Sequence, residues 1–212
     1  QKYIHNPLLI HRRKFDIRTF VLMTSVNANT KVFIYEEGYL RTSCREYSIN
    51  NLSNRLVHLT NDAVQKRAED YGKFEPGNKL SYNEFQQLLD KNYPDLNICF
   101  ERDIVSQMNK LTTDVFRACH GKLDPKRRLN TMEVFGLDFM IDDEFKTYLI
   151  EVNTNPCLEL SCPLLARLIP TMLENALKIG MDANFMPPEN FTMKKTFIGD
   201  PCPENRFQLC FD

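Results

Sequence analysis

The sequence predicts an α+β fold in which helices cover an antiparallel sheet. Two runs rich in β-branched and aromatic residues, Thr19–Thr24 and Lys31–Tyr35, flank the polar Asn27-Ala28-Asn29, which predicts a hairpin. Apolar residues then recur at helical spacing from about Arg102 to Cys119 and from Pro163 to Ile179. These strands and helices together indicate a mixed domain.

The first predicted strand has charged and apolar residues in alternation at Lys14-Phe15-Asp16-Ile17-Arg18. A strand places Lys14, Asp16 and Arg18 on one face and the two apolar residues on the other. Such a row can organise a phosphate through a lysine and a carboxylate through the fork of an arginine. The alternative is an exposed strand face whose ion pairs are worth under about 1 kcal/mol each.

Three helices are expected after the first hairpin. Ser81 and Glu84 form a capping box that opens a helix to about Asp90. The two periodic stretches give the others, and Gly180 is a plausible stop for the last one. Pro170 is expected to kink that last helix or to reset its start.

A second hairpin is predicted from Leu137–Ile141, the acidic turn Asp142-Asp143-Glu144 and Lys146–Val152. Alternation places Glu151 and Asn153 on one face, and pairing around the turn brings Asp138 near them. Two carboxylates and an amide oxygen suit Mg²⁺, which prefers hard oxygen ligands. Solvated strand ends are the alternative interpretation.

Composition is that of an ordinary globular protein: 212 residues, 42% hydrophobic and 26% charged. The net charge of −1 gives no global field of the kind that marks nucleic-acid binders. Two local basic groups stand out, either as solvated surface or as attraction to an acidic partner or to phosphates. They comprise Lys2, Arg12, Arg13, Lys14 and Arg18, and then Lys122, Lys126, Arg127 and Arg128.

Seven scattered cysteines without CxxC spacing are expected to be free thiols in a reducing compartment. No apolar run approaches the roughly 18 residues that span a bilayer, and no signal peptide is recognised. From Asp182 onward Pro187-Pro188, Pro201 and Pro203 break any period, so residues 182–212 are expected to be an extended or partly disordered tail after a domain at 1–181.

The motifs, taken in order, resemble the tubulin tyrosine ligase family of ATP-grasp ligases. The resemblance covers roughly residues 1 to 180. It rests on Gln1–Ile4 with Asn6–Ile10, Arg13–Arg18, Glu37–Arg41, His58–Asn61, and Asp138–Asp142 with Leu149–Pro156.

This resemblance implies an ATP-dependent ligase that joins tyrosine, glutamate or glycine to tubulin through an acyl phosphate. It implies ATP and Mg²⁺ as cofactors, and the acidic tubulin tail and a free amino acid as partners, with neither nucleic acid nor membrane involved. The expected location is the cytoplasm and the microtubule cytoskeleton, including cilia. The N-terminal ATP-grasp subdomain, with its lysine and glycine-rich loop, is expected to be missing from this chain.

The same resemblance assigns roles to individual residues. Those implied to bind ATP are Gln1, Lys2, Tyr3, Ile4, Lys14, Asp16, Thr60 and Asn61. Those implied to hold Mg²⁺ are Asp138, Glu151 and Asn153. Arg18 and Arg41 are implied to face the reacting acids.

Several of these residues have simpler interpretations. Arg41, which follows a predicted strand and a glycine, would as a lone arginine lie on the surface. Thr60 and Asn61 can begin a helix as N-cap residues. His58 is expected to be structural, and Cys157 to be a packing residue beside the metal strand.

The added amino acid stays open at this point. The segments 61–66 and 71–78 look closer to the tyrosine ligase itself, whereas Thr154–Leu158 has the form shared by the other modifying relatives. A non-catalytic tubulin-binding module of the same fold and an ATP-grasp ligase with a non-tubulin acceptor are the alternatives.

Overall fold

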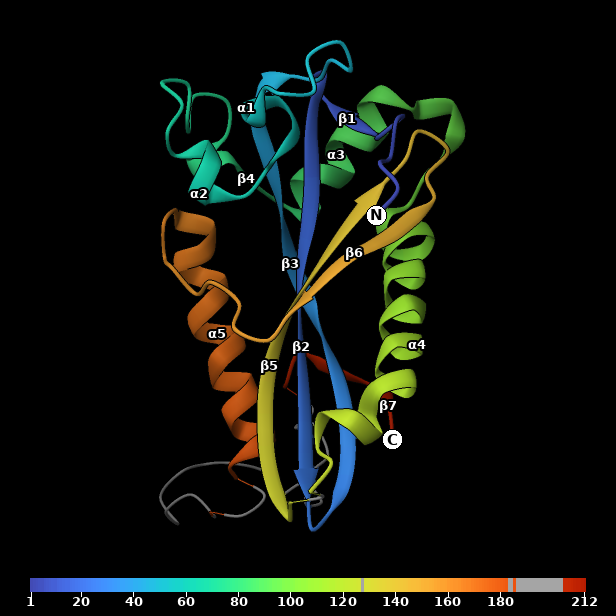
Figure 1. The fold of residues 1–212 in the computed structure, drawn as a ribbon, viewed down its shortest axis with the longest axis vertical. Coiled ribbons are helices and arrows are strands. Elements are labelled where there is room, and N and C mark those ends of the chain that lie inside the picture. The colour runs from blue at the N-terminus through green and yellow to red at the C-terminus, as the bar shows by residue number, and fades with distance from the viewer. Residues whose placement is uncertain (127, 183–184, 186–203) are drawn as a thin grey trace.

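The computed structural model describes residues 1–126, 128–182, 185 and 204–212. Its centre is a sheet in the order β4-β3-β2-β5-β6, with β1 paired to β2 and β7 to β3. Every strand pairing in the described part of the chain is antiparallel. Figure 1 shows helices on both sides of the long central strands. The predicted α+β class with an antiparallel sheet is therefore confirmed.

The strands are β1 Leu9–Ile10, β2 Arg13–Val26, β3 Asn29–Glu46, β4 Lys79–Ser81, β5 Asn130–Ile141, β6 Thr147–Asn153 and β7 Phe207–Phe211. The α-helices are α1 Arg55–His58, α2 Asp62–Gln65, α3 Tyr82–Asn92, α4 Ser106–Leu123 and α5 Pro163–Gly180. Short 3₁₀ turns lie at η1 Pro76–Asn78 and η2 Pro94–Leu96, and η3 Phe100–Val105 is a π-helical turn that leads into α4.

The β2–β3 hairpin turns at Asn27 and Ala28, which have φ values of 52° and 64°. Two central residues with positive φ give the turn whose twist matches that of the flanking strands. Both strands are longer than predicted, and β3 continues through Gly38 to Glu46. Arg41 consequently lies within a strand rather than after one.

The second hairpin is confirmed, but its first strand begins earlier than expected. We predicted Leu137–Ile141, whereas β5 starts at Asn130 because it pairs with β2 from Val26↔Asn130 onward. The polar residues at its start give no strong alternation, so pairing with a neighbouring strand decides the boundary.

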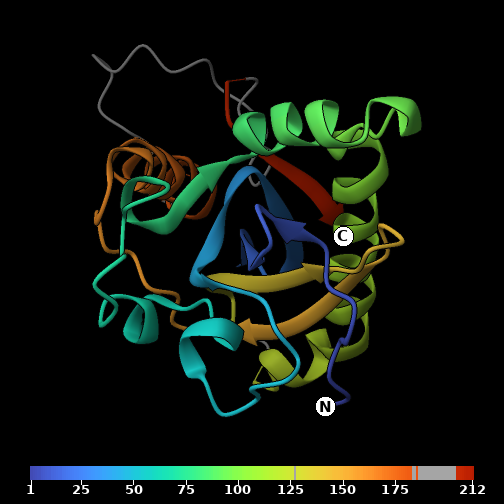
Figure 2. The same cartoon turned by 90° about the horizontal axis from the view of Figure 1, so that it is seen from above.

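The two faces of the sheet carry separate hydrophobic cores. Phe15, Ile17 and Val21 of β2 pack in the core that includes residues of α3 and α4. Phe20 and Leu22 point the other way and pack in the core that includes α5. Figure 2, seen from above, shows α4 and α5 on opposite sides of the central strands. Strand alternation therefore gives β2 two buried faces.

The α5 face of β2 changes character along its length. Lys14, Asp16 and Arg18 continue the row of Phe20 and Leu22, because alternate residues share a face. The predicted separation of charged from apolar residues in this strand is thus confirmed. Its apolar half packs against α5, while its polar half lines a pocket.

The helix predictions hold, with two refinements. The Ser81–Glu84 capping box is formed at the start of α3. The predicted helix at 102–119 begins as a π-helical turn and continues as α4. Helix α5 contains Pro170 and ends at Gly180, so the proline does not reset its start.

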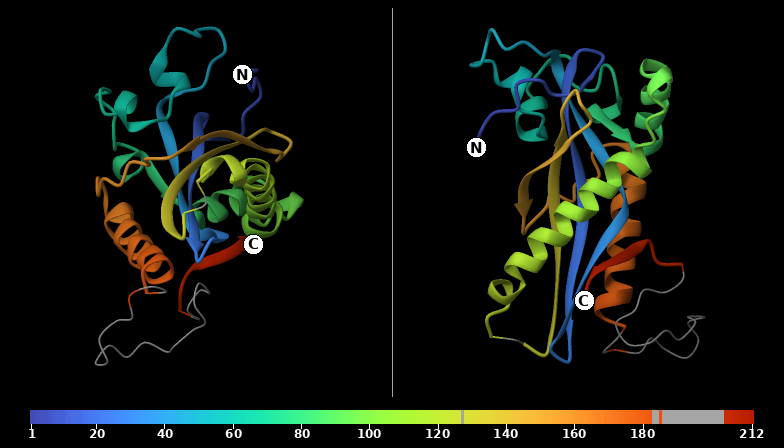
Figure 3. Two further views of the ribbon diagram at one scale, coloured as in Figure 1. Left: turned by 60° about the horizontal axis from the view of Figure 1, so that its bottom comes forward. Right: turned by 90° about the vertical axis from the view of Figure 1, so that its right-hand side faces the viewer.

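The described end of the C-terminal segment is a strand. Phe207–Phe211 forms β7, which pairs with β3 along its Val32–Tyr35 segment (Figure 3). Arg206 pairs with Glu36 and Glu37 at the start of this contact. Residues 183–184 and 186–203 of the expected tail lie outside the described residues. No helix in the described ranges is long and apolar enough to cross a membrane.

Replacing Ser81 by alanine should lower the free energy of unfolding by about 1 kcal/mol, because the Oγ that accepts from the Glu84 N–H is lost. Ser106→Ala is the matched control, since Ser106 sits in a helix and bonds only the Arg102 carbonyl among its side-chain contacts. Urea unfolding of both variants checks this. Equal stability of the two would mean that the capping box contributes nothing.

Candidate functional site

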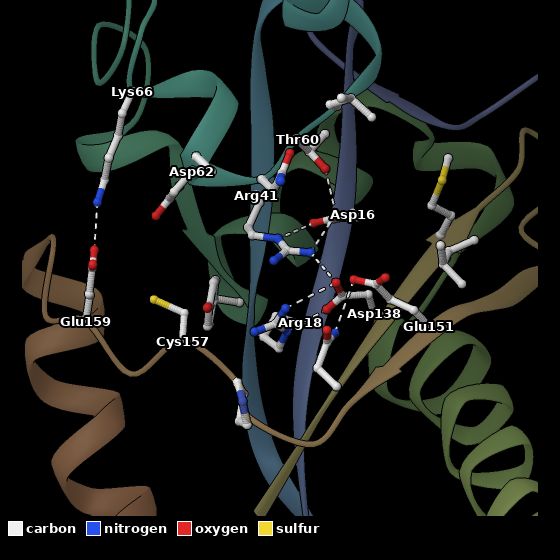
Figure 4. Close-up of a pocket in the computed structure, with 18 of the residues that line it drawn as sticks. Asp16, Arg18, Arg41, Thr60, Asp62, Lys66, Asp138, Glu151, Cys157 and Glu159 are labelled. Carbon is white, nitrogen blue, oxygen red and sulfur yellow. Dashed lines mark hydrogen bonds and ion pairs between the residues drawn. The ribbon is translucent and has the colours of Figure 1, made fainter.

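A pocket of about 640 Å³ opens on the polar half of the sheet (Figure 4). It brings together residues of β2, β3, β5 and β6 with the α1–α2 region and the loop before α5. Nine of the residues proposed from sequence line it: Lys14, Asp16, Arg18, Arg41, Thr60, Asn61, Asp138, Glu151 and Asn153. Segments far apart in the chain thus converge on one cavity.

Alternating charges form a ladder across three strands of this pocket, and we call these four residues the charge ladder: Asp16, Arg41, Asp138 and Arg18. Asp16 is opposite Arg41 in the β2–β3 pairing, and Arg18 is opposite Asp138 in the β2–β5 pairing. Residues directly opposite each other on neighbouring antiparallel strands have adjacent side chains. The register of the sheet therefore sets each pair.

The contacts within the ladder are bidentate. Arg41 Nε and Nη2 each donate to one oxygen of Asp16, both at 2.7 Å. Arg18 Nε and Nη2 donate to the two oxygens of Asp138, at 2.5 and 3.1 Å. Arg41 Nη2 also donates to Asp138 Oδ2 at 2.7 Å and so joins the two pairs. Figure 4 shows the continuous line of these contacts.

Burial and pairing act in opposite directions on these charges. Burial alone would raise the pKa of Asp138, but the Arg18 hydrogen bond and the charges of Arg41 and Arg18 hold that pKa below its ordinary value. Burial would lower the pKa of Arg41, and Asp16 and Asp138 outweigh it and raise that pKa. Arg18, Arg41 and Asp138 are buried, which excludes the simple exposed strand face as their explanation.

Thr60 and Lys14 extend the ladder toward the α1–α2 region. Thr60 Oγ1 donates to Asp16 Oδ2 at 2.6 Å. Lys14 Nζ donates to the His58 carbonyl at 3.0 Å and lies 5.0 Å from the centre of the Tyr3 ring. Burial lowers the pKa of Lys14, an effect that Asp16 partly offsets. A nearly buried ammonium in a cavity wall is suited to an anionic ligand.

His58 and Asn61, on either side of Leu59 and Thr60, have different surroundings. His58 has a structural environment, because its Nδ1 pairs with the Tyr3 hydroxyl at 2.7 Å and its Nε2 with the Asn51 carbonyl at 2.9 Å. Asn61 occupies the N-cap position of α2, but its side chain makes no cap hydrogen bond. Its amide instead belongs to the pocket wall.

The proposed metal ligands lie together at the end of the second hairpin. Asp138 is opposite Glu151 in the β5–β6 pairing, and Asn153 Nδ2 donates to Glu151 Oε1 at 3.2 Å. The described residues contain no group of three or more His, Cys, Asp or Glu side chains that could by itself hold a metal ion. Mg²⁺ commonly uses one or two carboxylates together with substrate phosphates. Glu151 and the amide oxygen of Asn153 fit that pattern, and Asp138 would have to contribute lone pairs beyond those that accept from Arg18 and Arg41.

The first four residues are not part of the pocket wall. Gln1 Nε2 donates to the carbonyl of Ile150 on β6 at 2.7 Å, and Tyr3 contacts His58. Gln1 and Lys2 are exposed, while Tyr3 and Ile4 are half-buried. Their contact with a nucleotide base stays a prediction.

The two basic groups differ in burial: Lys122, Lys126 and Arg128 of the second group are exposed, whereas three cations of the first are buried. Arg13 is buried, and its Nη1 donates to Glu75 Oε2 at 3.0 Å, while Lys14 and Arg18 are also buried. The interpretation as solvated surface is thus wrong for these three cations, because internal acids or carbonyls engage them, and attraction of Lys14 and Arg18 to phosphates stays a prediction. In the second group Arg128 pairs with Asp124, and Arg127 lies outside the described residues.

The pocket also contains residues that the sequence did not single out as functional. Asp62 accepts from the buried Lys79 at 2.5 Å. Lys66 and Glu159 pair at 2.7 Å, and each shifts the pKa of the other toward the charged form through this hydrogen bond. Their separation of 93 residues gives no local signal for this pair. Cys157 is exposed in the pocket wall, so its interpretation as a packing residue is wrong.

Cations beside carboxylates in one cavity define a candidate site for phosphate, metal and carboxylate. Comparison with known proteins agrees with such chemistry: residues 1–190 match the tubulin-tyrosine ligase family. The chain belongs to this family, which implies an ATP-grasp fold.

Several curated relatives carry the name of a single activity. Tubulin glycylase 3D of Tetrahymena thermophila is 36% identical over 185 residues, covering 86% of this chain and 17% of that protein. Tubulin glycylase 3A of Drosophila melanogaster is 36% identical over 210 residues, covering 96% of this chain and 20% of that protein. Protein monoglycylase TTLL8 of Homo sapiens is 32% identical over 214 residues, covering 99% of this chain and 24% of that protein. The chain therefore spans about a quarter or less of these three relatives.

Asp138→Asn should lower the free energy of unfolding by about 3 kcal/mol, because it leaves Arg18 buried without a counter-charge and leaves Arg41 with Asp16 alone. Asp143→Asn, in the exposed turn of the same hairpin, is the matched control. The depressed pKa of Asp138 gives stability that is present above its unfolded-state value of about 3.9 and is lost as pH falls through the folded value.

Denaturant unfolding between neutral pH and about pH 2.5 tests both effects. The parent protein should lose more stability than Asp138→Asn over the acid range. Equal acid sensitivity would show that the Asp138 ion pairs do not stabilise the fold.

Proposed function

We propose that the complete protein is an ATP-dependent ligase that joins an amino acid to tubulin, with glycine as the amino acid. The observation that carries this proposal is the convergence of Lys14, Arg18 and Arg41 with Asp138 and Glu151 in one pocket of a chain from this family. Phosphate, carboxylate and metal chemistry need these residue types at one place.

The reaction we propose is carboxylate activation. The terminal phosphate of ATP passes to a carboxylate and gives an acyl phosphate and ADP. An amine then attacks the acyl carbon, phosphate leaves with the C–O bond electrons, and the amine loses a proton as the amide forms. Little covalent chemistry is required of the protein, which aligns the reactants and balances growing negative charge.

The residues of the pocket suit these tasks. Lys14 offers its ammonium to phosphate oxygens, and Arg18 and Arg41 can donate to a carboxylate or acyl phosphate through the N–H groups that Asp138 and Asp16 leave over. Because Asp16 and Asp138 already position both guanidinium groups, the arginines lose little freedom when an anion binds. Asp138, Glu151 and Asn153 would hold Mg²⁺, which when bound offsets the charge of phosphate oxygens.

The choice of glycine rests on the names of relatives rather than on the pocket. Eight curated relatives are named as tubulin or protein glycylases, at 31–36% identity. Residues 61–66 and 71–78 resemble the tyrosine ligase locally and would favour tyrosine. We give more weight to the names of the relatives, which favour glycine. Tubulin as acceptor, and microtubules as the place of action, follow from the same names.

Incubating the full-length protein with tubulin, ATP, Mg²⁺ and one labelled amino acid at a time tests the proposal. We expect label from glycine to enter tubulin, and no label without ATP. Incorporation of glutamate or tyrosine in its place would contradict the choice of glycine. Binding of tubulin without any incorporation would instead support the non-catalytic module.

Glu151→Gln in the full-length protein should abolish ligation and leave the fold intact. The substitution removes one negative charge beside Asn153 at nearly constant volume. Glu133→Gln, an exposed position on β5 outside the pocket, is the matched control and should keep full activity. Initial rates at saturating Mg²⁺ provide the measurement. Unchanged turnover of Glu151→Gln would remove that residue from the site.

Arg18→Lys should reduce kcat/KM by roughly thirtyfold or more, equivalent to about 2 kcal/mol, because the charge remains but the fork is lost. The exposed Arg12, paired with Glu46, supplies the control substitution Arg12→Lys. Thermal unfolding of both variants separates a folding defect from a catalytic one. A drop below about threefold would mean that Arg18 serves only to neutralise Asp138.

A further inference from the structure

One ion pair in the pocket differs from all the charges of the ladder. Lys66, directly after α2, and Glu159, in the loop between β6 and α5, form a contact of 2.7 Å between separate parts of the wall. Both residues line the pocket and both are exposed, so they lie at its rim. In Figure 4 this pair lies on one side of the view, and Glu151 lies on the other.

Exposure separates Lys66 from the other cations of the pocket wall. The side chain of Lys66 is 41% exposed and that of Glu159 is 63% exposed. Arg18 and Arg41 are 5% and 9% exposed, and both engage the buried Asp138. A buried pair resists separation because breaking it strands a charge, whereas solvent readily replaces either partner of an exposed pair. Lys66 is thus the lining cation, among the described residues, whose partner exchanges most easily.

The partner itself indicates what can replace it. Glu159 presents a carboxylate on a short, flexible side chain from an exposed loop. A glutamate side chain of another polypeptide has the same chemistry and can make the same contact. Lys66 is a compact charge that needs no fixed fork geometry, so it accepts a carboxylate from different directions. An acidic polypeptide that enters the pocket would meet Lys66 at the rim before it reaches the ladder.

We propose that Lys66 binds a carboxylate of an acidic acceptor polypeptide at the rim of the pocket, and that Glu159 occupies this position until the acceptor displaces it. The proposal deepens the proposed function and rests on it, because it assigns the acceptor of that reaction to this side of the pocket. It makes Lys66 a docking residue and Glu159 an internal competitor.

The alternative interpretation is a purely structural one, in which the Lys66–Glu159 ion pair only holds the loop before α5 against α2. The two interpretations differ when the charges are exchanged. The double variant Lys66→Glu with Glu159→Lys can restore an ion pair, and hence the tether. It places a negative charge where the acceptor carboxylate would bind, so docking should remain impaired.

Binding of a fluorescein-labelled oligoglutamate peptide to the full-length protein, followed by anisotropy, is the direct test. We expect Lys66→Gln to weaken binding about fivefold and Glu159→Gln to strengthen it, with both effects shrinking at high salt because exposed charges are screened beyond about 8 Å. Lys73→Gln is the matched control, since Lys73 is exposed and paired with Asp70 but does not line the pocket.

Ligation kinetics provide the second readout. Lys66→Gln should raise KM for the acceptor about fivefold, with KM for ATP unchanged and the thermal unfolding midpoint preserved. The charge-exchanged double variant should be at least as impaired as Lys66→Gln. Recovery of peptide affinity in that double variant, or equal effects of Lys66→Gln and Lys73→Gln, would overturn the docking role.

The outcomes also separate this inference from the proposed function. If the parent protein ligates normally but Lys66→Gln binds the peptide as tightly as the parent does, the docking role of Lys66 is wrong and the ligase function still holds. If peptide binding depends on Lys66 but the protein joins no amino acid to any acceptor, the ligase function is wrong and Lys66 still serves as a docking residue.

Discussion

The buried charge ladder of Asp16, Arg41, Asp138 and Arg18 is the constraint on which the rest of the site depends. Arg41, Asp138 and Arg18 are buried and Asp16 is half-buried, and such charges are stable only if each finds its opposite, since an unpaired buried charge costs several kcal/mol. The pairs form because Asp16 is opposite Arg41 and Arg18 is opposite Asp138 in the sheet. A slip of one residue in either pairing would turn these side chains to the hydrophobic face. The ladder therefore selects the register of β2 against both of its neighbours.

The same constraint prepares the pocket for its chemistry. Arg18 and Arg41 are held by fixed carboxylates, so their donors are positioned before any anion enters. The exposure of the charged side chains increases outward, from the ladder to Glu151 on the edge strand and to Lys66 at the rim. This gradient suits a reaction in which the interior must be rigid for phosphoryl transfer while the rim exchanges partners with a macromolecule. The chain itself spans 17% and 20% of the lengths of two of its relatives, so the reaction of the complete protein is a proposal.

Local sequence rules predicted the elements and most of the pocket. The alternation at Lys14–Arg18 and the spacing of Glu151 and Asn153 were enough to put those side chains on shared faces, because strand periodicity is a local property. These local rules could not predict which charged side chains form ion pairs. No residue near Asp138 in the sequence indicates that Arg18 and Arg41 neutralise it. The early start of β5 and the Lys66–Glu159 contact were missed for the same reason, since both arise between segments distant in sequence. The net basic charge of residues 1–18 did not indicate that Arg13, Lys14 and Arg18 are buried, because the groups that engage them lie elsewhere in the sequence.

A double-mutant cycle between Asp16 and Arg41 tests most directly whether the ladder is an energetic unit. The cycle compares the free energies of unfolding of the parent, Asp16→Asn, Arg41→Gln and the double variant. A coupled ladder predicts that each single change is costly and that the double change costs much less than their sum, with a coupling of about 2 kcal/mol or more. Additive effects, with a coupling below about 0.5 kcal/mol, would contradict it. The charges would then be neighbours that share a pocket without organising it.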